Sequence, residues 1–368
     1  MEVYREGGEG RVKICYISSM NIHTKRWVEH FAERGHEVHL ITNKPGDIDN
    51  AHVHAIELNL WKISPFLKAI IIRRLVKRIK PDILHAHQIS PFGLYGALSG
   101  YHPFILSNWG AYHISVFPEK SFLHKAFIQY ILRSADLIHT GEETSTRTIK
   151  RLIRKRNSIQ MIRWGIDPDL FKPMKIERDE NIRILYLMRS EWPYGVETLL
   201  YAIPEVIKTH KNVQFLIRKN GRELNKTFDT VKKLRIEKYI KFIDEIPHDK
   251  VPKLMNSCDI YVNTLYRKTV VGIGITDLEA MGCELPVVVP NTQGIEHFVK
   301  NEVSGLIYKG EDSGSLANAI SRLIENEELR KKLGKNARKY ILEKQNWNKN
   351  MKLMETIYEK LAKDGAKI

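Results

Sequence analysis

The sequence predicts an α/β protein built from two doubly wound parallel sheets. Short runs rich in β-branched residues alternate with helical segments along the whole chain, which is typical of β-α-β units. The chain has 368 residues, too many for one hydrophobic core and enough for two domains. A polar, proline-bearing stretch at 165–181 interrupts the alternation, and we interpret it as the connection between the domains.

The first domain is predicted at 11–170. It opens with strands RVKICYIS and EVHLIT, separated by the helix TKRWVEHFAERG. Trp27, Val28 and Phe31 recur there at helical spacing, and Gly35 ends the helix. Four more strands are predicted at DILHAH (82–87), FILSNW (104–109), DLIHT (136–140) and IQMIRW (159–164).

The second domain is predicted at 180–344, where the alternation restarts. From about residue 312 onward the pattern is helical to the end of the chain. The strands of this domain are predicted at RILYLM (183–188), VQFLIR (213–218), YIKFID (239–244), DIYVNT (259–264), PVVVP (286–290) and GLIY (305–308).

The composition indicates a soluble protein of a reducing compartment. Hydrophobic residues make up 43% and charged residues 28%, and no apolar run approaches the roughly 18 residues of a membrane span. The polar start, MEVYREGGEGRVK, does not resemble a secretory signal. Three cysteines without paired spacing argue against disulfides and a zinc site. We therefore expect a cytoplasmic location.

The formal net charge of +16 suggests an anionic partner. Nucleic acid is not expected, because the basic residues are scattered and no nucleic-acid-binding motif accompanies them. The segment SPFLKAIIIRRLVKRIKP (64–81) leaves two interpretations open: a helix lying on an anionic membrane, or a packing helix with a solvated basic face. A lipid-linked acceptor would reconcile both. Its apolar stripe is predicted to comprise Leu67, Ile70, Ile71, Leu75, Val76 and Ile79, with Arg73, Arg74, Lys77, Arg78 and Lys80 around it.

Open parallel sheets bind ligands at the carboxyl ends of their strands, which draws attention to VVGIGITDLEAMGCELPVVVP at 270–290. Gly272 and Gly274 allow a ligand to approach the backbone, and a helix begins near Ile275 or Thr276 with unpaired N–H groups. Glu279, one turn further, can accept two hydrogen bonds from a sugar diol. Together they predict a clamp for a nucleotide-diphosphate sugar. The alternative is that the helix dipole alone favours Glu279.

The run LEAMGCELPVVVPNTQGIEHFVKNEVSGLIY resembles the donor-binding signature of glycosyltransferase family 4, which has the GT-B fold of two Rossmann-like domains facing a cleft. GHEVHLIT, PDILHAH and GIDPDLFKP also resemble parts of that family. WNKNMKLMETIYEKL resembles its closing helix, which implies that 345–368 returns to the first domain. Within the family, NIHTKRWVEHFAERGHEV, HPFILSNWG and LMRSEWPYGVETLL resemble a subgroup with Ile-His-Thr-x-Arg-Trp, Ser-x-Trp-Gly and Arg-Ser-x-x-Pro-x-Tyr motifs.

The resemblance implies sugar transfer from a nucleotide donor with retention of configuration, without metal or cofactor. The donor is expected on the second domain, and a glycan, lipid-linked or small-molecule acceptor on the first. The family's diphosphate-binding Arg matches Arg189, and its Lys position falls on Tyr194, as in the subgroup. We predict catalytic roles for Arg189, Glu279, His87 and His113. The predicted donor site comprises Gly272, Gly274, Ile275, Thr276, Glu279, Arg189, Tyr194 and Ile246.

The chain departs from the family pattern at three positions. The first acid of the paired-glutamate motif falls on Val271, a frequent acceptor-side His falls on Trp109, and the subgroup's Asp falls on Tyr112. His113 can substitute for that Asp. These departures support a second hypothesis, a nucleotide-sugar-binding protein or partner subunit that does not catalyse transfer.

The predicted acceptor site comprises His23, Trp109 and Gly110. His85 and His87 are taken to alternate on their strand, so that only His87, nearer the carboxyl end, faces the cleft. A packing role is the alternative for each histidine. Neither HAH at 85–87 nor DPD at 167–169 is predicted to bind metal, and the latter is interpreted as a turn starting at Pro168. A dinucleotide dehydrogenase is not expected, because no Gly-x-Gly-x-x-Gly follows the first strand.

Overall fold

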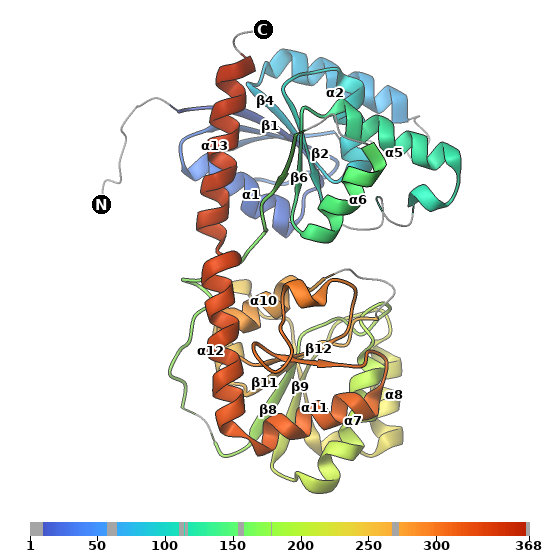
Figure 1. Cartoon of the computed structure of the whole chain (residues 1–368), viewed down its shortest axis with the longest axis vertical. Helices are drawn as coiled ribbons and strands as arrows, with labels where there is room; N and C mark the ends of the chain where they lie inside the picture. Colours follow the sequence, from blue (N-terminus) through green and yellow to red (C-terminus); the bar gives the residue numbers. More distant parts are fainter. Residues whose placement is uncertain are drawn as a thin grey trace. The chain divides into compact units, whose positions relative to one another are not determined.

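The computed structural model describes residues 10–56, 65–109, 114, 117–153, 158–177, 179–266 and 272–365. The chain divides into two compact units, one formed by Met1–Arg163 with Lys349–Ile368 and the other by Trp164–Asn348. Each unit has a parallel sheet covered by helices (Figure 1). The predicted class, two doubly wound parallel sheets, is therefore confirmed.

The sheet of the first unit has seven described strands, in the order β3-β2-β1-β4-β5-β6-β7. The chain runs outward from β1 to β3 and then crosses to β4, which makes the sheet doubly wound. Its strands are β1 (Lys13–Ile17), β2 (Glu37–Thr42), β3 (Ala51–Ala55), β4 (Ile83–His87), β5 (Phe104–Asn108), β6 (Leu137–Thr140) and β7 (Ser158–Met161).

Helices cover both faces of this sheet (Figure 1). Helices α2 (Pro65–Ile79), α3 (Leu94–Ser99), α5 (Phe122–Ser134) and α6 (Glu143–Ile153) pack on one face over an apolar core. Short helical turns occur at Ile89–Gly93 and Phe117–Glu119. Helix α1 (Ile22–Glu33) and the end of helix α13 (Trp347–Gly365) cover the other face, where Trp27 and Tyr358 contact His85.

The second unit has six described strands in the order β10-β9-β8-β11-β12-β13. These are β8 (Ile182–Tyr186), β9 (Val213–Arg218), β10 (Ile240–Ile243), β11 (Ile260–Val262), β12 (Val287–Pro290) and β13 (Leu306–Tyr308). One core lies under α7 (Val196–Thr209), α8 (Leu224–Leu234) and α11 (Ser313–Glu325). A second core lies under α9 (Val251–Asn256), α10 (Ile275–Gly282) and α12 (Glu327–Lys344). Single 3-10 turns occur at Glu237–Tyr239, His248–Lys250 and Ile295–His297.

The segment that follows residue 163 belongs to the second unit, although the first domain was predicted to extend to residue 170. Ile166 and Phe171 are buried in the core that also holds α10 and α12. The Ile166 N–H donates to the Gln345 carbonyl at 2.8 Å, and the Trp347 N–H donates to the Ile166 carbonyl at 2.9 Å. Tertiary contacts of these residues set the division of the chain.

Strand β3 has no counterpart among the predicted strands. Its sequence, AHVHA, contains one β-branched residue and two histidines. It forms the edge of the sheet and pairs only with β2 among the described strands, from Val38 opposite Ala51 to Thr42 opposite Ala55. Pairing with a neighbour, rather than local propensity, creates this strand.

The apolar stripe predicted for residues 64–81 is partly wrong. Ala69, Ile72 and Val76 form the buried side of α2, and Leu75 and Ile79 pack against the same core. Leu67 and Ile70, predicted to belong to the stripe, are instead exposed. At about 3.6 residues per turn, Leu67 and Ile70 lie on the side of the helix that faces away from Ile72 and Val76.

The three cysteines are free and buried. Within the described residues, no helix is both long and apolar enough to cross a membrane.

Candidate functional site

Glu279 lies on α10, and its side chain is almost completely buried. Its carboxylate is held by a histidine that follows β10: the Nε2 of His248 lies 2.8 Å from Oε1 of Glu279. The His248 ring in turn packs against the buried ring of Phe171, with centroids 5.3 Å apart. The acid singled out in the sequence is therefore oriented by two residues that the sequence analysis did not identify.

The loop before α10 is folded tightly on itself. Gly272 has φ of 82°, a conformation that glycine adopts without strain. Its N–H donates to the Gln293 carbonyl at 2.8 Å, and its own carbonyl accepts from the Thr292 hydroxyl at 2.8 Å. Gly272 thus shapes the loop, and its N–H is already engaged.

Gly274 is the N-cap of α10, and its N–H donates to Oδ2 of Asp277 at 2.8 Å. Gly274 was predicted to belong to the donor site, but its amide is bound by an acid of its own helix. The amides of Ile275 and Thr276 lie in the first turn, where a helix offers them no acceptor of its own. They are the part of the predicted anion site that remains available.

Asp277 is a buried acid that the sequence analysis missed. Its side chain is inaccessible to solvent, and Oδ2 also accepts from Nδ2 of Asn263 at 2.6 Å. Burial raises the pKa of Asp277 to about 7, against the opposing effect of these hydrogen bonds. An acid three residues after a glycine N-cap was the available signal, because the third helical position is where a capping-box acid lies.

Arg189 follows β8 and is half-exposed. Its Nε lies 3.1 Å from Oε1 of Glu191. The Nε of Arg222 lies 3.3 Å from the other oxygen of the same carboxylate, which also accepts the Arg222 N–H at 2.9 Å. This backbone hydrogen bond, with the two guanidinium groups, lowers the pKa of Glu191. Two arginines therefore converge on one acid, and only Arg189 was predicted.

The loop that carries Arg189 lies beside the start of α10. Strands β8 and β11 are neighbours, so their carboxyl ends share one edge of the sheet. A Cβ built on Gly274 would lie 3.5 Å from Cε of Met188, the residue before Arg189. The structure thus brings the loop that carries Arg189 next to the N-terminus of α10.

Tyr194 packs, partly buried, against the core under α7. Its N–H donates to the Glu191 carbonyl at 2.8 Å, and its carbonyl accepts from the hydroxyls of Tyr186 and Thr264. Tyr194 was predicted to belong to the donor site. The contacts present are packing contacts and backbone hydrogen bonds.

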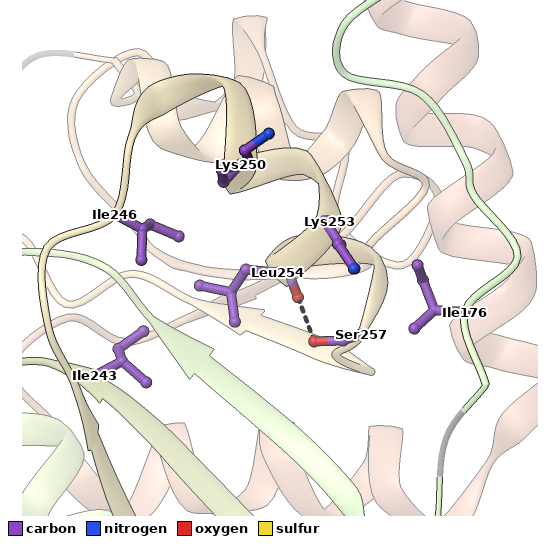
Figure 2. A pocket seen from close by; sticks show the side chains of 7 residues that line it. All are labelled: Ile176, Ile243, Ile246, Lys250, Lys253, Leu254 and Ser257. Atoms are coloured by element: carbon purple, nitrogen blue, oxygen red, sulfur yellow. Dashed lines mark hydrogen bonds between the residues drawn. The ribbon is translucent and has the colours of Figure 1, made fainter.

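Ile246 lines a pocket of about 300 Å³ beside α9 (Figure 2). Ile243 and Leu254 contribute to its apolar wall, and Lys253 lies at the side of Ser257. Asn256 fixes the neighbouring linker segment through hydrogen bonds to Lys172 and Met174. The complete lining consists of Ile176, Ile243, Ile246, Lys250, Lys253, Leu254 and Ser257.

The acceptor-side residues belong to the first unit. His87 is fully buried at the end of β4, and its ring stacks on Trp109 with centroids 4.1 Å apart. His23 is exposed in the first turn of α1. Gly110 and His113, and the divergent positions Tyr112 and Val271, lie outside the described residues.

The expectation that His85 and His87 face opposite ways is wrong. Both rings contact Tyr16 and Trp27, and their centroids are 4.7 Å apart. Residues two apart on a strand share a face, because side chains alternate with a period of two. Burial lowers the pKa of both imidazoles well below the usual value.

His85 belongs to a chain of hydrogen bonds beneath α1 and α13. His139 Nε2 lies 2.8 Å from the Ile162 carbonyl, which can only accept, so the neutral ring accepts the Ser107 hydroxyl at Nδ1. The Ser107 oxygen then accepts from Nε2 of His85 at 2.7 Å. The Tyr358 hydroxyl donates to Nδ1 of His85, also at 2.7 Å. Because the Ile162 carbonyl can only accept, the donor and the acceptor of each hydrogen bond in this chain are fixed.

No group of three potential metal-ligating side chains is found among the residues that the structure describes. At the DPD stretch, Oδ1 of Asp167 accepts the N–H groups of Asp169 and Leu170, which closes a turn.

Each of the two units matches a model of a known protein family. The family model described as "Glycosyl transferase 4-like" matches residues 13–142, and the one described as "Glycosyl transferases group 1" matches residues 169–340. N-acetyl-alpha-D-glucosaminyl L-malate synthase of Bacillus anthracis is 23% identical over 90% of this chain and 91% of its own. An N,N'-diacetylbacillosaminyl-diphospho-undecaprenol alpha-1,3-N-acetylgalactosaminyltransferase of Campylobacter jejuni is also 23% identical, over 76% and 78%.

Among solved structures, Anabaena HepE in complex with UDP-glucose aligns with a TM-score of 0.75 and 17% identity, covering 94% of this chain and 99% of that one. This likeness identifies the fold as GT-B. Because the two family models together span both units, the chain belongs to the group 1 and 4-like glycosyltransferases.

Proposed function

We propose that the protein is a retaining glycosyltransferase that uses a nucleotide-diphosphate sugar. One observation carries the proposal: the loop of Arg189 lies beside the start of α10, the helix that bears the buried Glu279, at the carboxyl edge of the second unit's sheet. A cation and a helix N-terminus suit a diphosphate, and an oriented carboxylate suits the ribose diol. Ligands of open parallel sheets bind at this edge.

The proposed reaction exchanges one bond at the anomeric carbon of the donor sugar. The bond to the diphosphate oxygen breaks, and the acceptor oxygen bonds to the same face. The acceptor's proton passes to the departing phosphate oxygen, so no protein base is required. Arg189 and the amides of Ile275 and Thr276 stabilise the charge that develops on the diphosphate, the kind of preorganised stabilisation that is usually the largest catalytic term. The proposal includes neither metal nor cofactor.

The relatives guide the choice of substrates. HepE was crystallised with UDP-glucose, so UDP-sugars are the first donors to test. The names of the two relatives contain malate in one case and a diphospho-undecaprenol in the other. We therefore propose that the acceptor is a small molecule, a glycan or a lipid-linked sugar, with the last favoured by the basic helix α2. The free, buried cysteines support a cytoplasmic location.

A protein that binds a nucleotide sugar without transferring it is the second candidate, suggested by Val271 at the position of a family acid. Thermal-shift screening against UDP, GDP, ADP and CDP and their sugars identifies the donor, because a ligand of the native state raises the melting temperature. Purified protein is then incubated with the radiolabelled donor and candidate acceptors. Transfer or donor hydrolysis supports the transferase, and tight binding without either supports the second candidate. No binding of any nucleotide contradicts both.

A further inference from the structure

We propose that the ends of α2 and α5 form a surface that docks on an anionic lipid bilayer, with Phe122 and Leu123 entering the acyl layer. This proposal extends the membrane association suggested by the sequence of α2 to a second helix. It rests on the proposed function in one respect: a lipid-linked acceptor would explain why the protein binds a membrane.

The start of α5 exposes two large apolar side chains in succession. Phe122 is 82% and Leu123 is 76% accessible to solvent, the two highest values among the large hydrophobic side chains that the structure describes. Ser121 caps the helix by accepting the His124 N–H at 3.3 Å, so the pair is fixed at a helix start. Single exposed hydrophobic residues are common on protein surfaces, but adjacent ones with this exposure have no role in the fold.

The outer side of α2 supplies a second apolar element with positive charge. Leu67 and Ile70 are 46% and 47% exposed. Arg74, Lys77 and Arg78 follow at positions i+4, i+7 and i+8 from Ile70, which places them on the same side of the helix. All three are exposed, and none forms an ion pair with a described residue. Between residues 65 and 80 the chain contains six basic residues and no acid.

The topology brings these two elements to one edge of the first unit. Helices α2 and α5 each follow a strand of the parallel sheet and run back against it, so both begin at the carboxyl edge. Both also cover the same face of the sheet (Figure 1). Leu67, Ile70, Phe122 and Leu123 lie near these helix starts, and Arg74, Lys77 and Arg78 continue along the same side of α2 away from the edge. We call these seven residues the α2–α5 surface.

Charge and shape favour a bilayer as the occupant. A lipid surface needs no matching cavity, and it accepts a protruding phenylalanine and leucine while its phosphates attract the basic side chains. A protein partner of ordinary stability needs about 800 Å² of complementary surface on each side, which a two-residue projection does not offer. Glu119 is the one acid near the projection between residues 117 and 134, and it is outnumbered by Lys120, Lys125 and Arg133.

Vesicle flotation of the full chain tests the proposal. We expect co-flotation with phosphatidylcholine vesicles that contain phosphatidylglycerol at low salt, and loss of it at high salt or without the anionic lipid. Phe122→Ser with Leu123→Ser reduces the bound fraction by about tenfold or more, since withdrawing even one such side chain from an apolar phase costs about a factor of ten. The triple variant Arg74→Glu, Lys77→Glu, Arg78→Glu reduces it by about tenfold or more.

Matched controls separate this surface from general charge and hydrophobicity. Leu353→Ser removes another exposed leucine, 58% accessible, on α13. Lys332→Glu, Lys335→Glu, Lys339→Glu makes the same change in net charge on exposed residues of α12. Both controls are expected to float like the unmodified protein. Circular dichroism and the UDP-induced thermal shift confirm that each variant folds, and neither depends on lipid.

Three outcomes contradict the proposal. The first is that the unmodified protein fails to float with anionic vesicles at low salt. The second is that the variants float as well as the controls. The third is that Phe122→Ser with Leu123→Ser instead abolishes a concentration-dependent dimer measured by light scattering. Flotation without nucleotide binding would overturn the proposed function alone. Nucleotide-dependent transfer to a soluble acceptor without flotation would overturn this inference alone.

Discussion

His248 and Glu279, 31 positions apart in the sequence, are joined by a 2.8 Å contact between Nε2 and Oε1. The histidine is half-exposed and the acid is buried, so the ring closes one side of the carboxylate and leaves Oε2 for another donor. A carboxylate accepts about four hydrogen bonds. His248 can therefore orient Glu279 for the ribose of the proposed donor.

His248→Ala is expected to weaken binding of the donor with little change in kcat. A hydrogen bond to a charged group contributes roughly 1.5–3 kcal/mol, which corresponds to an increase of about tenfold or more in KM for the donor. His248→Gln keeps an N–H donor at similar reach and is expected to restore most of the affinity. Steady-state kinetics with varied donor measures both. Equal losses in the two variants would show that the ring acts only by packing against Phe171.

Arg189→Ala is expected to reduce turnover by about 10²-fold or more, the effect of removing one preorganised donor to a developing negative charge. Arg322→Ala is the matched control, since Arg322 is similarly exposed and also paired with a glutamate. Turnover is measured with a radiolabelled donor at saturation. Near-normal turnover of Arg189→Ala would remove this residue from the catalytic step.

Asp277→Asn is expected to change how stability depends on pH. Burial raises the pKa of Asp277 to about 7, whereas an aspartate of the unfolded chain titrates near 3.9. The native state holds this proton more tightly, so raising the pH between these two values costs the unmodified protein up to a few kcal/mol of unfolding free energy. Asparagine keeps an oxygen for the Gly274 N–H and carries no titratable proton.

Urea denaturation of both proteins at pH 5 and pH 8 measures this difference, because the other titrating groups are shared and cancel. The unmodified protein is expected to lose more stability toward pH 8 than the variant. Parallel losses would mean that Asp277 is ionised in the native state throughout this range.

Tyr358→Phe is expected to destabilise the first unit by about 1–3 kcal/mol, the cost of leaving buried polar groups without a partner. The change removes the hydroxyl that donates to His85 and accepts from Tyr16 and Trp27. Tyr130→Phe, at an exposed tyrosine, serves as the control. Denaturation monitored by tryptophan fluorescence gives the change in stability, and an unchanged midpoint would show that the hydrogen-bonded chain contributes nothing net.

The predicted strands and helices agree with the structure wherever a local pattern was strong. The β-branched runs became strands because buried parallel strands require them, and Gly272 and Gly274 marked the loop before α10. Strand β3 was missed because an exposed edge strand needs little apolar sequence. The outward position of Leu67 and Ile70 was missed because the predicted stripe was drawn wider than the side of the helix that Ala69, Ile72 and Val76 bury.

The sequence by itself determined the fold class, the family and the identity of Glu279 and Arg189 as candidate residues. Only the tertiary structure decided which partners those residues have. Nothing in the sequence paired His248 with Glu279 or Glu191 with Arg189 and Arg222. These residues become neighbours because the parallel strands of the sheet all end at one edge. Hydrogen bonds between residues distant in sequence depend on the complete sheet order, which local propensity does not encode.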